Sequence, residues 1–227
     1  MKIVVSLFSA SMIRFLAAAS AALACSLAAT SASAQTAGAD TLLKELKKGG
    51  TVLFMRHGET GAAYADRSQT VIGDCSTQRN LNALGRQQNE KMADAIKALR
   101  VPIGKVLTSD FCRSWQTAEA LFGKTGYTVT NQLTVPMSYP GVSKSDADLN
   151  NANLNALLSE RPAAGSNTFL VSHGVNVQLA TGYHPNVQGE VVVFRPEGNG
   201  KYARLGSLLP DDWSQLASQA TKAAPVK

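Results

Sequence analysis

Three short segments of this sequence carry histidine or arginine directly after an apolar run. They are Arg-His-Gly-Glu-Thr at 56–60, the segment from Ser109 to Ala118 with Arg113, and Ser-His-Gly at 172–174. Guanidinium groups offer planar forks that suit bidentate contacts with phosphate oxygens. A neutral imidazole can attack phosphorus, while a second one can bind the equatorial oxygens, over which charge spreads in the transition state. These residues therefore predict a phosphoryl-binding site made of Arg56, His57, Arg113 and His173, with Gly58 allowing the backbone to approach the ligand closely.

The elements that must position these residues alternate along the chain. Apolar runs bounded by turn residues predict strands at 51–55, 105–108, 127–135, 168–171 and 190–195, and an edge strand at 202–205. Helical spacing predicts helices at 41–48, 83–99, 111–122, 151–159 and 175–181, and the polar residues 59–80 predict a long loop. The alternation indicates an α/β fold, a three-layer α/β/α sandwich with a mostly parallel central sheet. In such sheets ligands bind at the carboxyl ends of the strands, where all three segments fall.

The first 34 residues have the composition of a secretion signal. They contain no Asp or Glu, carry Lys2 and Arg14, and end in Ala-Ser-Ala after an apolar run of 15 residues from Phe15 to Ala29. That run is shorter than the ~20 residues that span a bilayer, which favours a cleaved signal over an uncleaved anchor. We therefore expect a periplasmic or secreted protein with no stable membrane anchor after signal cleavage. Whether Met1 or Met12 is the start stays open.

The chain as a whole reads as one domain with short flanking segments. We divide it into the signal peptide 1–34, a linker and short helix at 35–50, the domain 51–209 and a polar tail 210–227. A length of 227 residues with 44% hydrophobic and 17% charged residues suits a single globular core.

Charge and cysteine content narrow the class of partner. The formal net charge of +6 falls to +4 once Lys2 and Arg14 leave with the signal. No block of like charges or basic helix with interleaved aromatics is present, so we expect no nucleic-acid partner but easy approach of a small anionic substrate.

The mature chain keeps Cys75 and Cys112, which in an oxidising compartment are either a disulfide or two free thiols. A bridge would be worth roughly 3–4 kcal/mol and would tie the long loop to the helix that carries Arg113.

The three segments together resemble the signatures of the histidine phosphatase (phosphoglycerate mutase-like) superfamily. Phe54 to Thr60 is similar to its R-H-G-E-[ST] motif, Ser109 to Ala118 to its S-x-x-x-R-x-x-Q-T-A motif, and 172–174 to its second-histidine motif. The resemblance covers about residues 50–196. It implies that His57 becomes phosphorylated and that water then hydrolyses the phosphohistidine. Arg56, Arg113 and His173 would bind the phosphoryl group.

The proton donor departs from the pattern of this superfamily. The mutase-like branch takes it from a Glu in the loop after the R-x-x-Q-T-A helix. Residues 120–144 of this chain, which include that loop, hold no Asp or Glu. The acid-phosphatase branch carries an Asp directly after the second histidine, where this chain has Gly174. Glu190 is our replacement candidate, because it precedes the last clear strand; its alternative is a surface carboxylate at the strand entry. Weaker candidates are Glu59, Asp74 and Asp110.

Other polar residues are weaker predictions. Arg79 and Asn80 lie in the long loop and could contact substrate, whereas His184 reads better as a surface-loop residue than as part of the pocket. Metal binding by the two histidines is disfavoured, because arginines flank them and no H-x-x-x-H or Cys/His cluster accompanies them. We therefore expect no metal and no cofactor.

The leading interpretation is a metal-independent phosphatase of phosphomonoesters, acting on cell-envelope sugar phosphates. A mutase is disfavoured because its usual acid is missing. Two alternatives stay open: a catalytically silent phosphate-binding module of the same fold, and a phosphohistidine phosphatase.

Overall fold

The computed structural model describes residues 30–61, 70–136 and 141–223, with side chains from Gly38 onward. The chain separates into two compact units, Met1–Gly38 and Ala39–Lys227. The described part of the first unit is the beginning of helix α2 (Thr30–Lys48). The predicted signal peptide lies mostly outside the described residues and stays a prediction.

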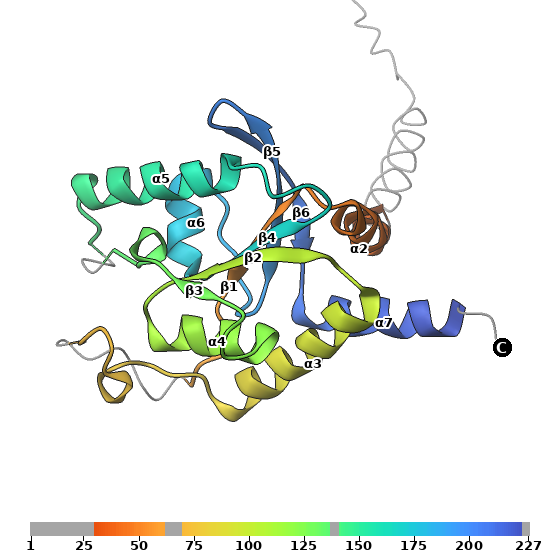
Figure 1. Ribbon diagram of the computed structural model, residues 1–227, viewed down its shortest axis with the longest axis horizontal. Helices are drawn as coiled ribbons and strands as arrows, with labels where there is room; N and C mark the ends of the chain where they lie inside the picture. The colour runs from red at the N-terminus through yellow and green to blue at the C-terminus, as the bar shows by residue number, and fades with distance from the viewer. Residues whose placement is uncertain (1–29, 62–69, 137–140, 224–227) are drawn as a thin grey trace, which may run out of the picture. The chain divides into compact units, whose positions relative to one another are not determined.

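A six-stranded sheet forms the centre of the second unit (Figure 1). Its strands are β1 (Val52–Arg56), β2 (Ile103–Thr108), β3 (Thr128–Val129), β4 (Asn167–Ser172), β5 (Val191–Gly198) and β6 (Lys201–Leu208). They lie in the order β3-β2-β4-β1-β5-β6. Strands β1 to β4 are parallel, while β5 pairs antiparallel with β1 and β6 antiparallel with β5. The predicted mostly parallel sheet is confirmed.

Helices cover both faces of this sheet. Helices α3 (Ala83–Leu99), α4 (Cys112–Phe122) and α7 (Pro210–Ala223) share one core with leucines of α2, and α5 (Lys144–Ser159) and α6 (Gly174–Thr181) contribute to the other. Strand β1 shows why two cores form, since Leu53 and Met55 enter the first core and Val52 and Phe54 the second. All four side chains are fully buried, as expected for a strand covered on both faces. The three-layer sandwich is therefore confirmed.

Several predicted elements differ from the structure, among them helix α5, which begins at Lys144 where residue 151 was expected. The strand expected at 127–135 is reduced to the two residues of β3, followed by the 3-10 helix η2 (Asn131–Leu133). The side chain of Thr130 accepts a hydrogen bond from the Gln132 backbone, and this local bond competes with strand extension. The first helix begins at Thr30 instead of Thr41, so residues 35–40 are helical where a linker was expected.

The polar tail expected at 210–227 contains one helix, and that helix packs into the core along residues 210–223. They form α7, in which Trp213 is 0% exposed and Leu216 is 4% exposed. Pro210 at the start and two aspartates in the first turn favour a helix here. Asp212 also accepts a hydrogen bond from the Leu209 backbone at 2.7 Å. The two apolar side chains are three residues apart, so they fall on one face and pack into the first core.

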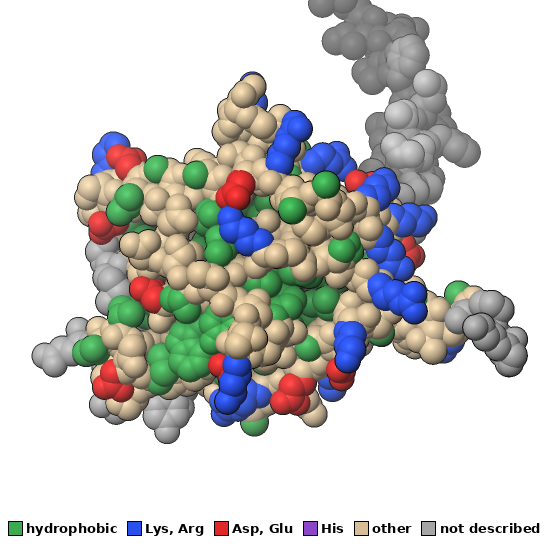
Figure 2. Space-filling view, in the orientation of Figure 1, with side chains coloured by type: hydrophobic (Ala, Val, Ile, Leu, Met, Phe, Trp, Pro, Cys, Tyr) green, Lys and Arg blue, Asp and Glu red, His purple; other side chains and the backbone are tan. Residues whose placement is uncertain are grey.

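The surface gives two further observations. Among the described residues, no helix is both long and apolar enough to cross a membrane. In the view of Figure 2, basic and acidic side chains are interspersed over the described surface, and hydrophobic side chains gather in the region of α4. The mixed signs on this face agree with the absence of charge blocks in the sequence.

Candidate active site

The carboxyl ends of β1, β4 and β2 lie side by side, with β4 in the middle. Their hydrogen bonding continues past the strands, since the His57 backbone N–H donates to Ser172 (2.9 Å) and that of Ser109 to Val171 (3.0 Å). This pairing brings the three motif segments to one edge of the sheet. The structure thus places together the histidines and arginines that the sequence predicted as neighbours.

His57 and His173 face each other across this edge. Their ring centroids are 5.4 Å apart in an edge-on arrangement, and the residues are only 2% and 4% exposed. The ring of Phe111 packs edge-on against His173 from the other side, at 5.0 Å. Both imidazoles are therefore held by packing in a largely desolvated environment.

The hydrogen bond of His57 determines which of its nitrogens carries the proton. Its Nδ1 lies 2.8 Å from the carbonyl oxygen of Gly58, and a carbonyl can only accept. Nδ1 therefore donates, and in the neutral ring the lone pair is on Nε2. This tautomer leaves Nε2 able to act as a nucleophile.

The surroundings also keep both histidines neutral. Burial lowers the pKa of His57 well below 6.5, and the charges of Arg113, Arg56 and Arg79 lower it further, while the bond to Gly58 acts in the opposite direction. The pKa of His173 is likewise well below 6.5, first because of burial and then because of Arg113. Arg79, which the sequence suggested only weakly, is thus close enough to act electrostatically on both rings.

The arginines are positioned by backbone carbonyls and by an aromatic ring. Arg56 donates from Nη1 to the carbonyl oxygens of Pro185 (2.9 Å) and Asn186 (3.2 Å). The guanidinium of Arg113 lies 4.7 Å from the centroid of the Phe111 ring, and its Nη1 donates to the carbonyl of Arg79 at 3.4 Å. Fixed guanidinium groups of this kind can bind an oxyanion without reorganising.

Gly58 lies where the segment that carries His57 meets α3 and α4. Its N–H donates to Thr117 Oγ1 at 2.9 Å, and that hydroxyl donates to the Arg113 carbonyl at 2.7 Å. A Cβ at position 58 would lie 2.6 Å from the buried side chain of Asn89, so only glycine fits. Asn89 was not identified from the sequence, because a polar residue in an amphipathic helix does not indicate on which side it contacts another segment.

His173 connects to a second set of polar side chains. Its Nε2 lies 3.2 Å from Ser109 Oγ and 3.5 Å from Ser114 Oγ. Ser109 in turn donates to Asp110 Oδ1 at 3.2 Å, which also accepts from Thr134 at 2.9 Å. Asp110 is therefore linked to His173 through one hydroxyl.

The predicted disulfide between Cys75 and Cys112 is confirmed, with a Cα–Cα distance of 5.7 Å. Beside it, Gln78 accepts from the Cys112 backbone at 2.9 Å and donates to the Val71 carbonyl at 3.0 Å. Asn80 donates to the Cys75 carbonyl at 2.7 Å, so it braces the loop internally. The described part of the long loop is therefore attached directly in front of Arg113.

Glu190 is buried just before β5, at the same sheet edge, where its backbone carbonyl accepts from the Arg56 N–H. Its carboxylate accepts from the Tyr183 hydroxyl at 2.5 Å and from the Val187 N–H at 3.5 Å. Glu190 is thus not a surface carboxylate. Among the described residues, however, its side-chain bonds go to the 183–187 segment and not to the histidines.

The other carboxylates proposed as donors have structural partners. Glu59 accepts a hydrogen bond from Asn82 at 3.3 Å. Asp74 caps the 3-10 helix η1 (Cys75–Thr77) by accepting from the Ser76 backbone at 2.9 Å.

His184 does not lie in a surface loop away from the pocket, contrary to the sequence interpretation. It is partly buried beside Gly174, and its Cε1 lies 3.1 Å from where a Cβ of residue 174 would be. Arg56 Cδ lies 3.4 Å from the same point. The sequence carried no signal for this contact, because the segment returns to the site only through the packing of α6 against the sheet.

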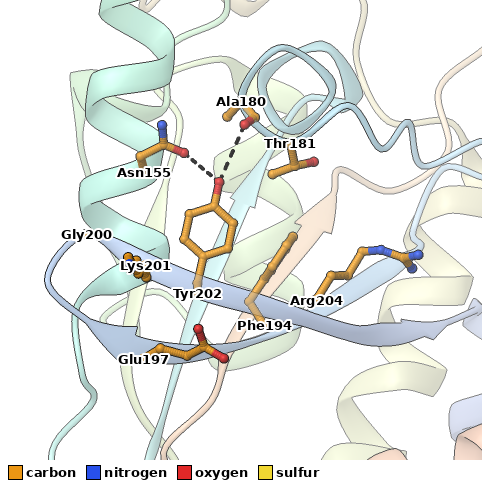
Figure 3. Close-up of a pocket in the computed structure, with 9 residues that line it drawn as sticks. All are labelled: Asn155, Ala180, Thr181, Phe194, Glu197, Gly200, Lys201, Tyr202 and Arg204. Carbon is orange, nitrogen blue, oxygen red and sulfur yellow. Dashed lines mark hydrogen bonds between the residues drawn. The ribbon is translucent and has the colours of Figure 1, made fainter.

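Two further features of the described residues bear on other chemistry. No three His, Cys, Asp or Glu side chains gather as a set of metal ligands among them. A pocket of about 540 Å³ lies between α5, α6 and the β5–β6 hairpin (Figure 3). There the Tyr202 hydroxyl bonds to Asn155 at 2.6 Å, and none of the predicted site residues lines the pocket. It is separate from the histidine pair.

Comparison with known proteins agrees with the motifs and the fold. Residues 52–133 match the model of the histidine phosphatase superfamily (branch 1). The protein histidine phosphatase SixA, complexed with tungstate, is 23% identical with a TM-score of 0.51, over 71% of this chain and 98% of that one. Phosphoserine phosphatase from Entamoeba histolytica, in complex with 3-phosphoglyceric acid, is 15% identical with a TM-score of 0.53, over 72% and 98%. At these identities the likeness concerns the fold. No curated protein matches the sequence at a significant level.

Proposed function

Since this chain belongs to the histidine phosphatase superfamily, we propose that it hydrolyses phosphomonoesters through a phosphohistidine intermediate on His57, with no metal and no cofactor. The observation that carries this proposal is the state of His57. Its Nδ1 donates to Gly58, and burial together with the neighbouring guanidinium charges lowers its pKa. A buried, neutral imidazole with its lone pair on Nε2 is suited to attack phosphorus.

The reaction proceeds in two displacements. Nε2 of His57 attacks phosphorus, the N–P bond forms, and the bond between phosphorus and the leaving oxygen breaks as that oxygen takes a proton. Water then attacks the phosphohistidine, the N–P bond breaks, and inorganic phosphate leaves with His57 restored. Each transfer spreads charge over the equatorial oxygens, where fixed cations lower the barrier.

The residues around His57 take the binding roles in this mechanism. Arg56 and Arg113 bind the phosphoryl oxygens through their guanidinium forks, and His173 binds a third oxygen from the facing side. Gly58 lets the His57 segment pack closely against α3, since a Cβ there would meet the Asn89 side chain at 2.6 Å. A backbone carbonyl holds Arg56 and the Phe111 ring holds Arg113, which supports binding by guanidinium groups that are already in place.

The compartment and substrate class follow from two features. The signal-like N-terminus and the Cys75–Cys112 disulfide support a periplasmic or secreted enzyme. In that compartment, sugar phosphates of the cell envelope are the substrates we favour. The bound groups of the two similar structures, tungstate and 3-phosphoglyceric acid, belong to those proteins and support only a small oxyanion or phosphorylated ligand here.

The test uses the purified mature protein and p-nitrophenyl phosphate in the presence of EDTA. We expect hydrolysis that EDTA leaves unchanged and that His57→Ala abolishes, together with an acid-labile phosphoenzyme in the wild type. Phosphate binding without turnover would instead identify a silent binding module. Inactivation by EDTA would point to a metallo-phosphatase, and a strong preference for phosphohistidine peptides over sugar phosphates would make the chain a phosphohistidine phosphatase.

A further inference from the structure

The residue that protonates the leaving oxygen is the missing part of this site, and His184 lies beside Arg56 and the residue that follows His173. Gly174 directly follows His173, and a Cβ at 174 would lie tightly against the imidazole of His184. The ring approaches that point to 3.1 Å with Cε1 and 3.5 Å with Nδ1, and Arg56 Cδ lies 3.4 Å from it. His184 therefore contacts the turn that carries one phosphoryl-binding residue and lies beside another.

The segment that carries His184 is bonded to the nucleophile strand at several points. The carbonyls of Pro185 and Asn186 accept from Arg56 Nη1 at 2.9 and 3.2 Å. The Gly189 N–H lies 3.0 Å from the carbonyls of both Arg56 and His57, and Gln188 accepts from the Thr60 N–H at 2.6 Å. The position of His184 relative to His57 is therefore set by direct bonds.

The ring nitrogens of His184 do not hold the structure together. Among the described residues this ring makes no hydrogen bond, and its Nδ1 is buried without a partner. Burying a polar atom without a partner destabilises the folded state, so its retention calls for an explanation such as a catalytic role. The other two histidines of the chain are already assigned to the phosphoryl group.

The carboxylates near this edge are engaged elsewhere. Glu190 accepts hydrogen bonds from Tyr183 and Val187, Asp110 accepts from Ser109 and Thr134, and Glu59 accepts from Asn82. Tyr183 is further held by the guanidinium of Arg204, 4.3 Å from its ring centroid. The Glu190–Tyr183 pair thus braces the segment that presents His184.

We propose that His184 is the general acid and base of this site, an inference that rests on the proposed phosphatase function. In the first displacement the imidazolium of His184 gives its proton to the leaving oxygen as the P–O bond breaks. In the second displacement the neutral ring takes a proton from the attacking water as the N–P bond breaks. The two steps return His184 to its starting state, so protons and electron pairs balance over the cycle.

The test compares two leaving groups in the same variants. p-Nitrophenolate leaves without help, whereas the alkoxide of an alkyl phosphate must be protonated. We expect His184→Gln to reduce kcat/KM on the alkyl phosphate by about 100-fold or more while changing p-nitrophenyl phosphate by less than about threefold. Val187→Ala, a change of an exposed side chain in the same segment, is the matched control and should leave both rates unchanged.

Two further measurements separate proton transfer from a structural role. Added imidazole should restore alkyl-phosphate turnover in His184→Ala, and the melting temperature of both His184 variants should stay near that of the wild type. Equal losses on the two substrates, or no loss on either, overturn the proposal for His184. So does a leaving-group-dependent loss in Glu190→Gln in place of His184→Gln, which would identify Glu190 as the donor. If the wild type shows no hydrolysis that depends on His57, the proposed function itself fails.

Discussion

The Nδ1 atom of His57 lies 2.8 Å from the carbonyl oxygen of Gly58, its own neighbour in the chain. This local bond selects the tautomer with a free Nε2, whereas the low pKa of the ring comes first from burial and then from the charge of Arg113, which is far away in the sequence. The state of the His57 ring is thus set by one contact within its motif and by the fold around it.

The first prediction concerns the pH dependence of stability. Both His57 and His173 have pKa values lowered below 6.5 in the folded state. Below pH 6.5 the unfolded chain binds protons at these positions before the folded protein does, so the free energy of unfolding should fall as the pH drops from 7.5 to 5.5. Urea unfolding at a series of pH values measures this slope, and His57→Asn should reduce it. A slope that is unchanged in both His57→Asn and His173→Asn would contradict the assignment.

The second prediction concerns the close contact at Gly58. Gly58→Ala places a methyl group 2.6 Å from the Asn89 side chain and should displace the His57 segment. We expect a loss of about 1–3 kcal/mol in stability and of about 100-fold in kcat/KM on p-nitrophenyl phosphate. Asn89→Ala in the same chain makes room for the methyl group and should recover part of the activity. If the double variant is no better than Gly58→Ala alone, the contact is not the cause.

The third prediction concerns the disulfide. Reduction of Cys75–Cys112 frees the described part of the long loop from the position directly before Arg113. Activity should decline at dithiothreitol concentrations that leave the far-ultraviolet circular dichroism unchanged. The free energy of unfolding of the double variant Cys75→Ser/Cys112→Ser should be about 3–4 kcal/mol lower than that of the wild type. Simultaneous loss of activity and helicity, or full activity after reduction, would contradict this.

The fourth prediction concerns α7. Trp213 is fully buried against the first core, so Trp213→Ala should reduce the free energy of unfolding by about 3–5 kcal/mol. Thermal or urea unfolding measures the loss, and kcat of the protein that remains folded should be unchanged because α7 contributes no site residue. Asp211→Asn, at the exposed start of the same helix, is the control, for which a change below about 1 kcal/mol is expected.

The sequence by itself determined which histidines and arginines come together and the order of the elements. Arg56 ends a strand, the segments that carry His57, Arg113 and His173 follow one, and parallel strands end at the same edge, so their convergence could be predicted from local pattern alone. The helix at 83–99 was predicted with the bounds that the structure shows, because its apolar spacing is regular. The cysteine pair could be predicted from its number and the expected compartment.

The tertiary structure alone decided what surrounds that chemistry. Asn89 against Gly58, His184 against Gly174, and Trp213 in the core are contacts between segments distant in the chain. No local pattern encodes them, because a polar or aromatic residue in a helix or loop has the same spacing whether it faces solvent or another segment. Desolvation follows the same rule: the lowered pKa of His57 depends on the layers packed over it, which only the folded chain brings together.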